Sequence, residues 1–485
     1  MRVADNTRGA YRIFYLLVGV YLLLGLINLA YVPVPWLDET ANLEPAIMWH
    51  RTGHLISKGW PNPGADKAFL SYPPAIHVLH YCNLAISPCT VFRIRLPFLL
   101  LHTGSILLLY FLLRKLGSAT WLAATVSALF MFDKVVFEIS KAARSETLEI
   151  FLLLLLLHLW FAGKRGFILG VLCGALVLTH LKEWPVAGLI ALAALYHNAP
   201  KIKLAFLAGI VLLPLWYLQF IHWDIHGLYQ QWFLQSTEHA AHGSVLQRIL
   251  DFLFTRFWPV YKEQPWVIPL HMVLLFMSCA QLRHWKKTET LPAILFAVGS
   301  IAWMLVLGPH YRYWPPMYLL GLLSAAPYLS QKVLRWKPWM WGITVPVAAG
   351  LAFPFVTRHT LGLVQREARD PQAALAFIEN FIPRGPKTLL IGAEIGQYYM
   401  ADKPETEFST LLYPDHFRFE DYQQVFLLTD KPVRWKALAI YNPGEPAWIR
   451  HYPNLGRAGT FQGMVLYRIQ SREQWDSIAR PFFPR

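Results

Sequence analysis

Long apolar stretches recur along this chain, and no other feature constrains its fold as strongly. About twenty consecutive apolar residues are needed for a helix to cross the hydrocarbon core of a bilayer. Charged residues make up only 15% of the chain, against about 25% in soluble domains. The sequence therefore predicts a mainly α-helical membrane bundle with about eleven spans. The predicted spans are 11–32, 93–113, 118–136, 147–163, 166–180, 184–197, 202–222, 266–282, 291–308, 313–329 and 338–356.

Basic residues in alternate turns between these stretches predict how the bundle is oriented. Lys and Arg are retained on the cytoplasmic side of membrane proteins, so the N-terminus is expected inside and the C-terminus outside. The apolar segment 73–88 is interpreted as a juxtamembrane or partly inserted helix, because a full span there would reverse this rule. The basic turns hold Arg114-Lys115, Lys164-Arg165, Lys201 with Lys203, Arg283 with Lys286-Lys287, and Lys332 with Arg335 and Lys337.

The net charge of +15 has the same origin. It is spread over these turns and does not form one basic patch, which argues against a nucleic-acid partner. Membrane lipids are the expected surroundings. Cys82 and Cys89 lie in the first outer loop, 33–92, and whether they pair stays open.

The sequence changes character after residue 357. Gly and Pro separate short β-branched and aromatic runs there, a pattern typical of strands. We therefore expect a membrane domain over 1–357, which includes the first outer loop with its juxtamembrane helices, and a small α/β domain outside the membrane over 358–485. The expected elements are strands at 388–391, 425–428, 437–440 and 464–469, and a helix at 371–381.

Acidic side chains are rare in the membrane half and follow the outer ends of spans. Asp38 and Glu39 come just after the first span. A carboxylate at that position can take a proton from an incoming hydroxyl or bind a metal, but Asp is also a favoured helix N-cap, and both interpretations stay open. Glu146 begins the fourth span, where the helix dipole alone also favours an acid.

Three cations on the outer side stand next to the ends of predicted spans, where the charge rule does not expect them. They are Arg144, Lys182 and Arg312. Outer cations in such a protein favour an anionic ligand such as a lipid phosphate, although long basic side chains also snorkel to lipid headgroups. His180 and His310 stand beside two of these cations and are secondary candidates.

The order of these motifs resembles that of the GT-C glycosyltransferases, in particular the aminoarabinose transferases and protein O-mannosyltransferases. The resemblance covers about residues 11–360. Two positions depart from the family pattern: Tyr72 stands where the family has a lysine, and Glu146 where it has an aspartate. The matching motifs are Asp38-Glu39, Ser71-Tyr72-Pro73-Pro74, Arg144-Ser145-Glu146, the turn Thr179 to Pro185, and Tyr311-Arg312-Tyr313.

This resemblance implies a GT-C-like bundle and a glycosyltransferase. The implied donor is a sugar on a polyprenyl or dolichyl phosphate, and the implied acceptor is a lipid, a glycan or a protein. Transfer would proceed with inversion, with Asp38 as the base and Glu39 and Glu146 orienting the acceptor or a divalent cation. The donor phosphate would meet Arg144, Lys182, Arg312, Tyr72 and Tyr313.

The implied location is the bacterial cytoplasmic (inner) membrane, with the site on the periplasmic or extracellular side. Two alternatives stay open. A secondary transporter predicts inverted repeats and charges near the bilayer midplane, whereas the charges here cluster at span ends. A non-catalytic protein of cell-envelope assembly would not need Asp38.

Overall fold

The chain divides into two compact units. The first comprises residues 1–28, 70–76 and 95–363, and the second comprises 29–69, 77–94 and 364–485. Most of the first outer loop therefore groups with the C-terminal region, a division that the sequence did not predict. The expected boundary near 357 lies outside the described residues. The computed structural model describes residues 7–27, 29–30, 37–58, 68–239, 247, 267–305, 314–333, 371–392, 395–401, 403–409, 417–429, 456–461 and 464–478.

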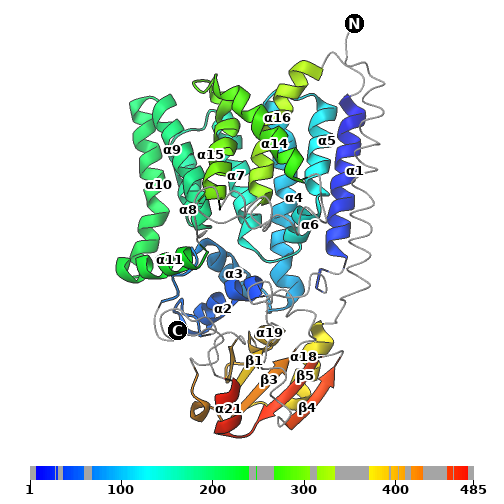
Figure 1. Cartoon of the computed structure of the whole chain (residues 1–485), viewed down its shortest axis with the longest axis vertical. Helices are drawn as coiled ribbons and strands as arrows, with labels where there is room; N and C mark the ends of the chain where they lie inside the picture. The colour runs from blue at the N-terminus through cyan, green and yellow to red at the C-terminus, as the bar shows by residue number, and fades with distance from the viewer. Residues whose placement is uncertain are drawn as a thin grey trace. The chain divides into compact units, whose positions relative to one another are not determined.

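The first unit consists of helices, most of which run side by side as a bundle (Figure 1). Its helices are α1 (Thr7–Leu26), α4 (Val91–Lys115), α5 (Thr120–Met131), α6 (Lys134–Ser140), α7 (Ser145–Phe161), α8 (Phe167–Val177), η1 (Leu181–Glu183), α9 (Trp184–His197), α10 (Pro200–Phe220), α11 (Ile225–His239), α14 (Val267–Leu282), η3 (Thr288–Thr290), α15 (Leu291–Leu305) and α16 (Trp314–Val333).

The predicted spans overlap these helices as far as the structure describes them, except that 118–136 is divided between α5 and α6, and 338–356 lies outside the described residues. Within the part of the chain that the structure describes, three helices, α1, α4 and α10, are long and apolar enough to cross a membrane by themselves. Helices such as α5 and α8 are apolar but shorter, so the count of about eleven spans stays a prediction. Helix α3 (Ala75–Ile86) has 12 residues, about 18 Å, which fits a juxtamembrane helix better than a full span.

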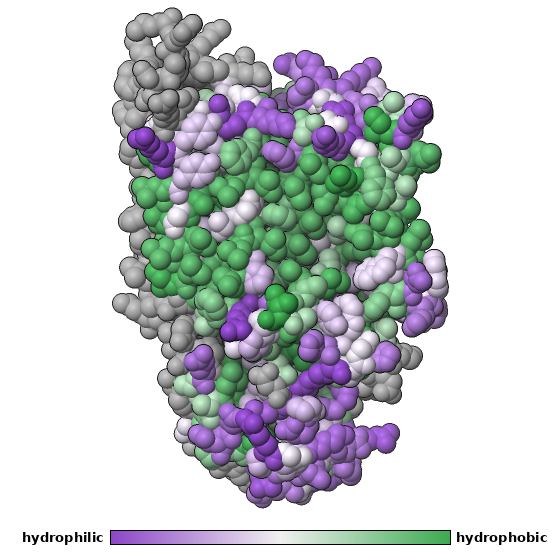
Figure 2. Space-filling model, turned by 180° about the vertical axis from the view of Figure 1, so that it is seen from behind, coloured by the Kyte–Doolittle hydropathy of each residue, from purple (hydrophilic) through white to green (hydrophobic). Residues whose placement is uncertain are grey.

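The outer surface of the bundle is apolar. Large side chains on α9, α10 and α14 are well exposed, among them Leu192, Leu204 and Phe276. Figure 2 shows hydrophobic residues gathered in a broad band over the helical part. A surface of this kind is stable only in contact with lipid or another apolar partner. The chain is a membrane protein.

Helices α8 and α10 pack with their backbones in close contact. A Cβ atom at Gly170 would collide with the carbonyl of Phe206, and one at Gly209 would collide with the carbonyl of Phe167. Close approach through small residues is how helices associate where no hydrophobic effect drives them together. The glycines thus allow α8, which precedes α9, to pack closely against α10, which follows it.

The second unit contains a five-stranded sheet in the order β2-β1-β3-β5-β4. Strands β1, β2 and β3 are parallel, whereas β5 is antiparallel to both β3 and β4. Its elements are α2 (Leu37–Thr52), α3, α18 (Pro371–Phe381), β1 (Thr388–Gly392), α19 (Ile395–Ala401), β2 (Thr406–Ser409), η6 (Phe419–Asp421), β3 (Gln424–Thr429), β4 (Gly456–Phe461), β5 (Met464–Ile469) and α21 (Arg472–Ile478).

The expected α/β character of the C-terminal region is confirmed. The predicted helix 371–381 and the strands at 388–391, 425–428 and 464–469 are present as α18, β1, β3 and β5, and 437–440 lies outside the described residues. Every residue of β1 is buried, as expected for a parallel strand covered on both faces. One face packs Leu389, Val425 and Ile469 against Trp475 of α21.

Candidate functional site

The first acidic pair lies in the first turn of α2. Helix α2 begins at Leu37, so Asp38 and Glu39 belong to the helix and Asp38 is not the N-cap before it. The Asp38 side chain lies outside what the structure describes. Glu39 is fully buried, and the hydroxyl of Tyr398 in α19 donates to its Oε1 over 3.3 Å. This acid is therefore fixed by a neutral donor from the C-terminal region.

Arg144 and Glu146 form a buried ion pair at the start of α7. Arg144 is the extended residue before the helix, and Glu146 lies in its first turn. The guanidinium donates from Nε to Oε2 over 2.9 Å and from Nη2 to Oε1 over 2.5 Å. This is the two-bond geometry in which guanidinium and carboxylate interact most strongly. The acid is thus held by a cation as well as by the helix N-terminus.

Lys182 is bound to a second acid of α7. Its Nζ lies 3.0 Å from Oε2 of Glu149, and the two side chains are 5% and 0% exposed. Glu149 follows Glu146 by three residues and so lies on the same face of the helix. In η1, the ring of His180 accepts a hydrogen bond from the backbone N–H of Lys182 over 3.2 Å. Lys182 is therefore an interior cation that does not snorkel, and His180 shapes its turn.

Glu183 adds a third buried carboxyl beside Glu149 and Lys182. Burial raises the pKa of Glu183, and the charge of Lys182 offsets this only in part. We call Arg144, Glu146, Glu149, Lys182 and Glu183 the α7 cluster. Its three acids and two bases would carry one excess negative charge if all were ionised. A proton held on one carboxyl removes that charge, which is costly inside a protein.

The segment before α3 is anchored near η1. The backbone N–H of Leu70 and the hydroxyl of Ser71 donate to Oε1 of Gln231 in α11, over 2.6 and 3.1 Å. The N–H of Ala75 donates to the carbonyl of Leu178 over 3.0 Å. Leu178 ends α8 just before the turn that carries Lys182. Two of the segments that the sequence singled out, 71–74 and 179–185, therefore lie together.

The remaining predicted residues are described only in part. Tyr72 is half-buried within the anchored segment, while His310, Arg312 and Tyr313 lie outside the described residues. Cys82 is exposed and Cys89 is buried, and no disulfide joins these two described residues.

Comparison with known proteins identifies the architecture. No protein-family model matches the chain, and no curated protein matches it in sequence. The crystal structure of ArnT from Cupriavidus metallidurans in the apo state superposes with a TM-score of 0.58 at 12% identity, covering 98% of this chain and 100% of that one. ArnT bound to undecaprenyl phosphate gives 0.55 at 12% identity, over 96% and 99%.

A third structure extends the comparison to another enzyme. The archaeal oligosaccharyltransferase AglB from Archaeoglobus fulgidus, in complex with an inhibitory peptide and a dolichol-phosphate, gives a TM-score of 0.54 at 12% identity, over 96% of this chain and 77% of that one. ArnT and AglB are GT-C fold glycosyltransferases. This chain has the GT-C fold. The resemblance that the sequence motifs indicated is confirmed at the level of the fold.

Within the GT-C fold, the two acid-bearing regions of this chain belong to different compact units. Asp38 and Glu39 are in the second unit, and the α7 cluster is in the first. The structure brings Arg144, Glu146 and Lys182 together in the α7 cluster. Among the described residues, no three His, Cys, Asp or Glu side chains are arranged to hold a metal ion, so no ligand set for a divalent cation can be named.

Several residues that lie beside the predicted site residues were not predicted themselves. Glu149 was visible in the sequence as an acid one turn after Glu146, which is the signal for a shared helix face. Glu183 was visible as an acid next to Lys182. Tyr398 and Gln397 carry no such signal, because their partners lie more than 350 residues away in the sequence.

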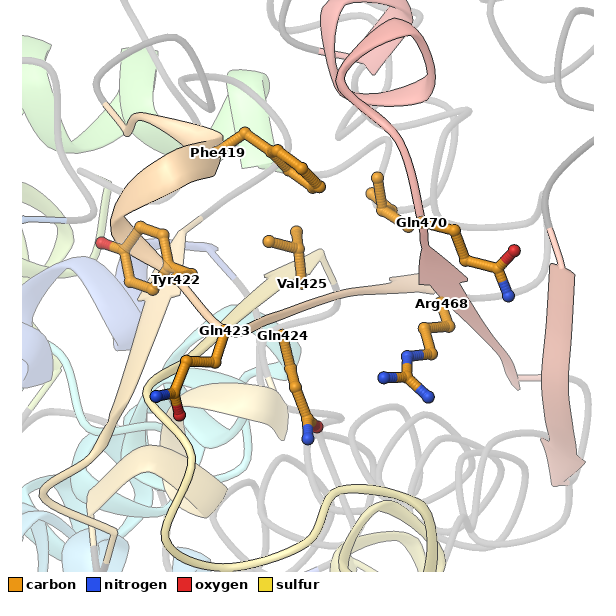
Figure 3. Close-up of a pocket in the computed structure, with 8 residues that line it drawn as sticks. Phe419, Tyr422, Gln423, Gln424, Val425, Arg468 and Gln470 are labelled. Carbon is orange, nitrogen blue, oxygen red and sulfur yellow. The ribbon is translucent and has the colours of Figure 1, made fainter.

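A polar hollow of about 300 Å³ lies at one end of the sheet of this GT-C chain. Figure 3 shows Gln424 and Arg468 pointing to one side of the strands, with Phe419 and Val425 on the other. Its chemistry differs from that of the acid-bearing regions, since amides, a guanidinium and aromatic rings surround it. The hollow is lined by Phe419, Tyr422, Gln423, Gln424, Val425, Arg468, Ile469 and Gln470.

Proposed function

We propose that this chain is an integral membrane glycosyltransferase that moves a hexose or pentose from a polyprenyl-phosphate donor to an acceptor. The acceptor is a lipid, a glycan or a protein, and it is met on the non-cytoplasmic face of a bacterial inner membrane. Transfer inverts the anomeric carbon, and Asp38 is the general base. No nucleotide or nucleic acid takes part.

The reaction is a single displacement. The acceptor oxygen or nitrogen forms a bond to the anomeric carbon as the bond from that carbon to the phosphate oxygen breaks. The acceptor proton passes to the Asp38 carboxylate, and polyprenyl phosphate leaves with the bonding electron pair. Because the leaving phosphate gains negative charge, nearby cations stabilise the transition state more than the ground state.

The α7 cluster suits this task. Lys182 and Arg144 are buried cations already bound to carboxylates, and an incoming phosphate would compete with Glu149 for Lys182. Charge-assisted hydrogen bonds to phosphate are among the strongest a protein makes. We assign donor contacts to Arg144, Lys182 and Arg312 with Tyr72 and Tyr313, and secondary roles to His180 and His310. Glu39 and Glu146 orient the acceptor or a divalent cation.

One observation carries the proposal. The GT-C fold of this chain matches, over almost its whole length, a structure bound to undecaprenyl phosphate and one bound to dolichol-phosphate. In this chain an acidic pair stands in the first turn of α2, and buried cations stand at the start of α7. The acids of α2 can supply a carboxylate base, and the cations at the start of α7 can bind the phosphate of a lipid-linked donor.

The test is Asp38→Asn in purified full-length protein. Asn keeps the size and polarity of Asp but cannot take a proton. Undecaprenyl phosphates carrying single hexoses or pentoses serve as donors, membranes from cells lacking the gene supply acceptors, and release of undecaprenyl phosphate is measured. A lost general base typically lowers the rate about 10²- to 10⁴-fold, so we expect at least a hundredfold loss with unchanged binding of undecaprenyl phosphate.

Glu44→Gln is the matched control. Glu44 is a buried acid of the same helix, and it accepts hydrogen bonds from Ser57 and from the backbone N–H of Lys58. Its substitution should lower stability and leave turnover per folded molecule within a few-fold. Turnover by Asp38→Asn close to that of the unaltered chain would remove Asp38 as the base, and the absence of transfer from every donor would overturn the proposed function.

A further inference from the structure

The second unit joins two segments that lie far apart in the sequence, α2 and α19. Helix α19 has seven residues, and Gly396 to Met400 are all buried. It belongs to the C-terminal region, whereas α2 belongs to the first outer loop and carries the acidic pair. Three side-chain hydrogen bonds connect these helices. Their positions along α2 indicate what the contact does.

The first bond reaches the backbone beside the acidic pair. The Gln397 amide donates from Nε2 to the carbonyl of Thr40 over 2.9 Å, and Gln397 and Thr40 are both about 1% exposed. A buried amide is stable only when it is hydrogen-bonded. Its acceptor lies one residue after Glu39. The contact therefore fixes the main chain of the turn that holds the acids.

That turn depends on contacts from outside the helix, because α2 contains a proline. Pro45 has no N–H to donate to the carbonyl of Ala41, and a proline ring also pushes against the carbonyl four residues earlier. The helix is therefore weakened at Ala41, directly after the carbonyl that Gln397 binds. The hydrogen bond from Gln397 in α19 thus stabilises the turn of α2 that lacks one of its own backbone hydrogen bonds.

The second bond fixes the rotation of the turn. The Tyr398 hydroxyl donates to Oε1 of Glu39 over 3.3 Å, and both side chains are buried. Neighbouring helical residues point about 100° apart. The hydrogen bond from Tyr398 therefore fixes the rotation of the backbone at Glu39, in the first turn of α2.

The third bond holds the opposite end of α2. The Arg51 guanidinium donates from Nη2 to the carbonyl of Met400, at the end of α19. Thr40 and Arg51 are eleven residues apart, about 16 Å along a helix. Attachment at both ends prevents α2 from tilting about either one. The contact therefore holds the helix that carries the acidic pair near both of its ends.

We infer that α19 is a positioning element for the reaction, and that Gln397 and Tyr398 hold the first turn of α2 in the geometry that transfer requires. The inference rests on the proposed function, in which the acidic pair Asp38 and Glu39 takes part in sugar transfer. Gln397 and Tyr398 do not touch the substrate. They act through Thr40 and Glu39, so the C-terminal region is needed for catalysis as well as for stability.

The test compares two neighbouring tyrosines. Tyr398→Phe removes only the hydroxyl that binds Glu39. Tyr399→Phe is the matched control, since the Tyr399 hydroxyl donates over the same 3.3 Å to the carbonyl of Ile382 within the C-terminal region. We expect Tyr398→Phe to lower kcat about tenfold or more with unchanged affinity for undecaprenyl phosphate, because small misplacements of reacting groups cost up to about a hundredfold. Tyr399→Phe should stay within twofold.

A second measurement does not depend on finding the donor. Hydrogen exchange of the full-length protein in detergent should be faster over residues 37–52 in Tyr398→Phe and in Gln397→Met, and unchanged there in Tyr399→Phe. In the double variant Glu39→Met with Tyr398→Phe, kcat should fall no further than in Glu39→Met alone, because each change breaks the same hydrogen bond.

The outcomes separate this inference from the proposed function. If Asp38→Asn is inactive but Tyr398→Phe behaves like Tyr399→Phe in turnover and exchange, α19 is not a positioning element and the glycosyltransferase proposal stands. Additive losses in the double variant would also overturn the inference. If Asp38→Asn keeps its activity, the catalytic proposal falls, and exchange over α2 still decides whether α19 holds that helix.

Discussion

The acids of α2 and the acids of α7 are stabilised by partners of different kinds. In α2, Glu39 accepts a hydrogen bond from the neutral phenol of Tyr398. In α7, Glu146 is paired with Arg144 and Glu149 with Lys182, each as a buried ion pair. A phenol orients a carboxylate without cancelling its charge, whereas a guanidinium or ammonium cancels it.

This difference supports the different tasks that we propose for the two regions. The hydrogen bond from the Tyr398 phenol leaves the charge on the Glu39 carboxylate, which suits the acceptor-orienting role proposed for Glu39. Burying a cation costs free energy of desolvation, and pairing with an acid offsets that cost. Such a cation can exchange its carboxylate partner for an anionic phosphate when the donor binds. The comparison therefore favours the proposed division, in which the acids of α2 act on the acceptor and the α7 cluster binds the donor.

The largest expected effect concerns the ion pair of the α7 cluster. Arg144→Met removes the partner of Glu146 and leaves a buried carboxylate without its guanidinium. Breaking one side of a buried pair costs about 3–5 kcal/mol. We expect the free energy of unfolding to fall by that amount, measured by denaturant titration in detergent, whereas Tyr398→Phe should cost only about 1 kcal/mol.

A double variant provides the control. In Arg144→Met with Glu146→Leu, both members of the pair become apolar, and such replacements are often neutral for stability. Stability should return to near that of the unaltered chain while binding of undecaprenyl phosphate stays weak. An equal loss in the single and double variants would show that Arg144 matters for a reason other than this pair.

The next largest effect concerns donor affinity. Lys182→Met should weaken binding of undecaprenyl phosphate about 10- to 100-fold, since a charge-assisted bond contributes about 1.5–3 kcal/mol. Glu149→Gln should strengthen that binding, because Lys182 no longer has to leave a carboxylate for the phosphate. Affinity can be measured by quenching of intrinsic tryptophan fluorescence on titration with the lipid.

Lys141→Met is the matched control for Lys182→Met. Lys141 is also a buried lysine of the first unit, but its Nζ donates to the carbonyl of Ile27 over 2.9 Å. Its substitution should leave affinity within twofold. If Glu149→Gln weakens lipid binding as much as Lys182→Met does, the pair binds as a unit and the exchange of partners is wrong.

The helices were predictable because their signal is local. The predicted spans at 184–197 and 202–222 correspond to α9 and α10, and the predicted helix 371–381 corresponds to α18. Apolar runs and charged turns encode such elements over a few residues each. The number of spans was less predictable, since α5 and α8 are too short to cross a membrane by length alone.

The partners of the site residues were not predictable. Sequence alone indicated that Lys182 is an unusual outer cation, but its pairing with Glu149 depends on how α8 packs against α7 and so places η1. The contact of Tyr398 with Glu39 spans 359 positions, and nothing near Tyr398 in the sequence marks it. Long-range pairing is fixed by tertiary packing, which local patterns do not encode.

The smallest expected effect is a pH dependence within the α7 cluster. Burial raises the pKa of Glu183, and the nearby charge of Glu146 adds to this, while Lys182 and a hydrogen bond with Glu149 act in the opposite direction. Between the pKa of a glutamate in the unfolded chain, about 4.3, and the higher pKa of folded Glu183, the folded state binds more protons. Stability therefore falls as pH rises through that window.

Glu183→Gln should remove this dependence, because an amide of the same shape does not ionise. We expect the thermal midpoint, followed by tryptophan fluorescence between pH 5 and 8, to be higher than that of the unaltered chain and to fall less steeply as pH rises.

Glu379→Gln is a control of opposite sign. Hydrogen bonds from Arg384 and Lys403 lower the pKa of Glu379, so its ionised form stabilises the fold above that pKa, although only weakly at the surface. A midpoint that falls in Glu183→Gln would mean that ionised Glu183 stabilises the cluster. Lys182 would then be shared between two carboxylates, and the contrast between the charge-neutralised acids of α7 and the phenol-bound acid of α2 would extend to all three acids of the cluster.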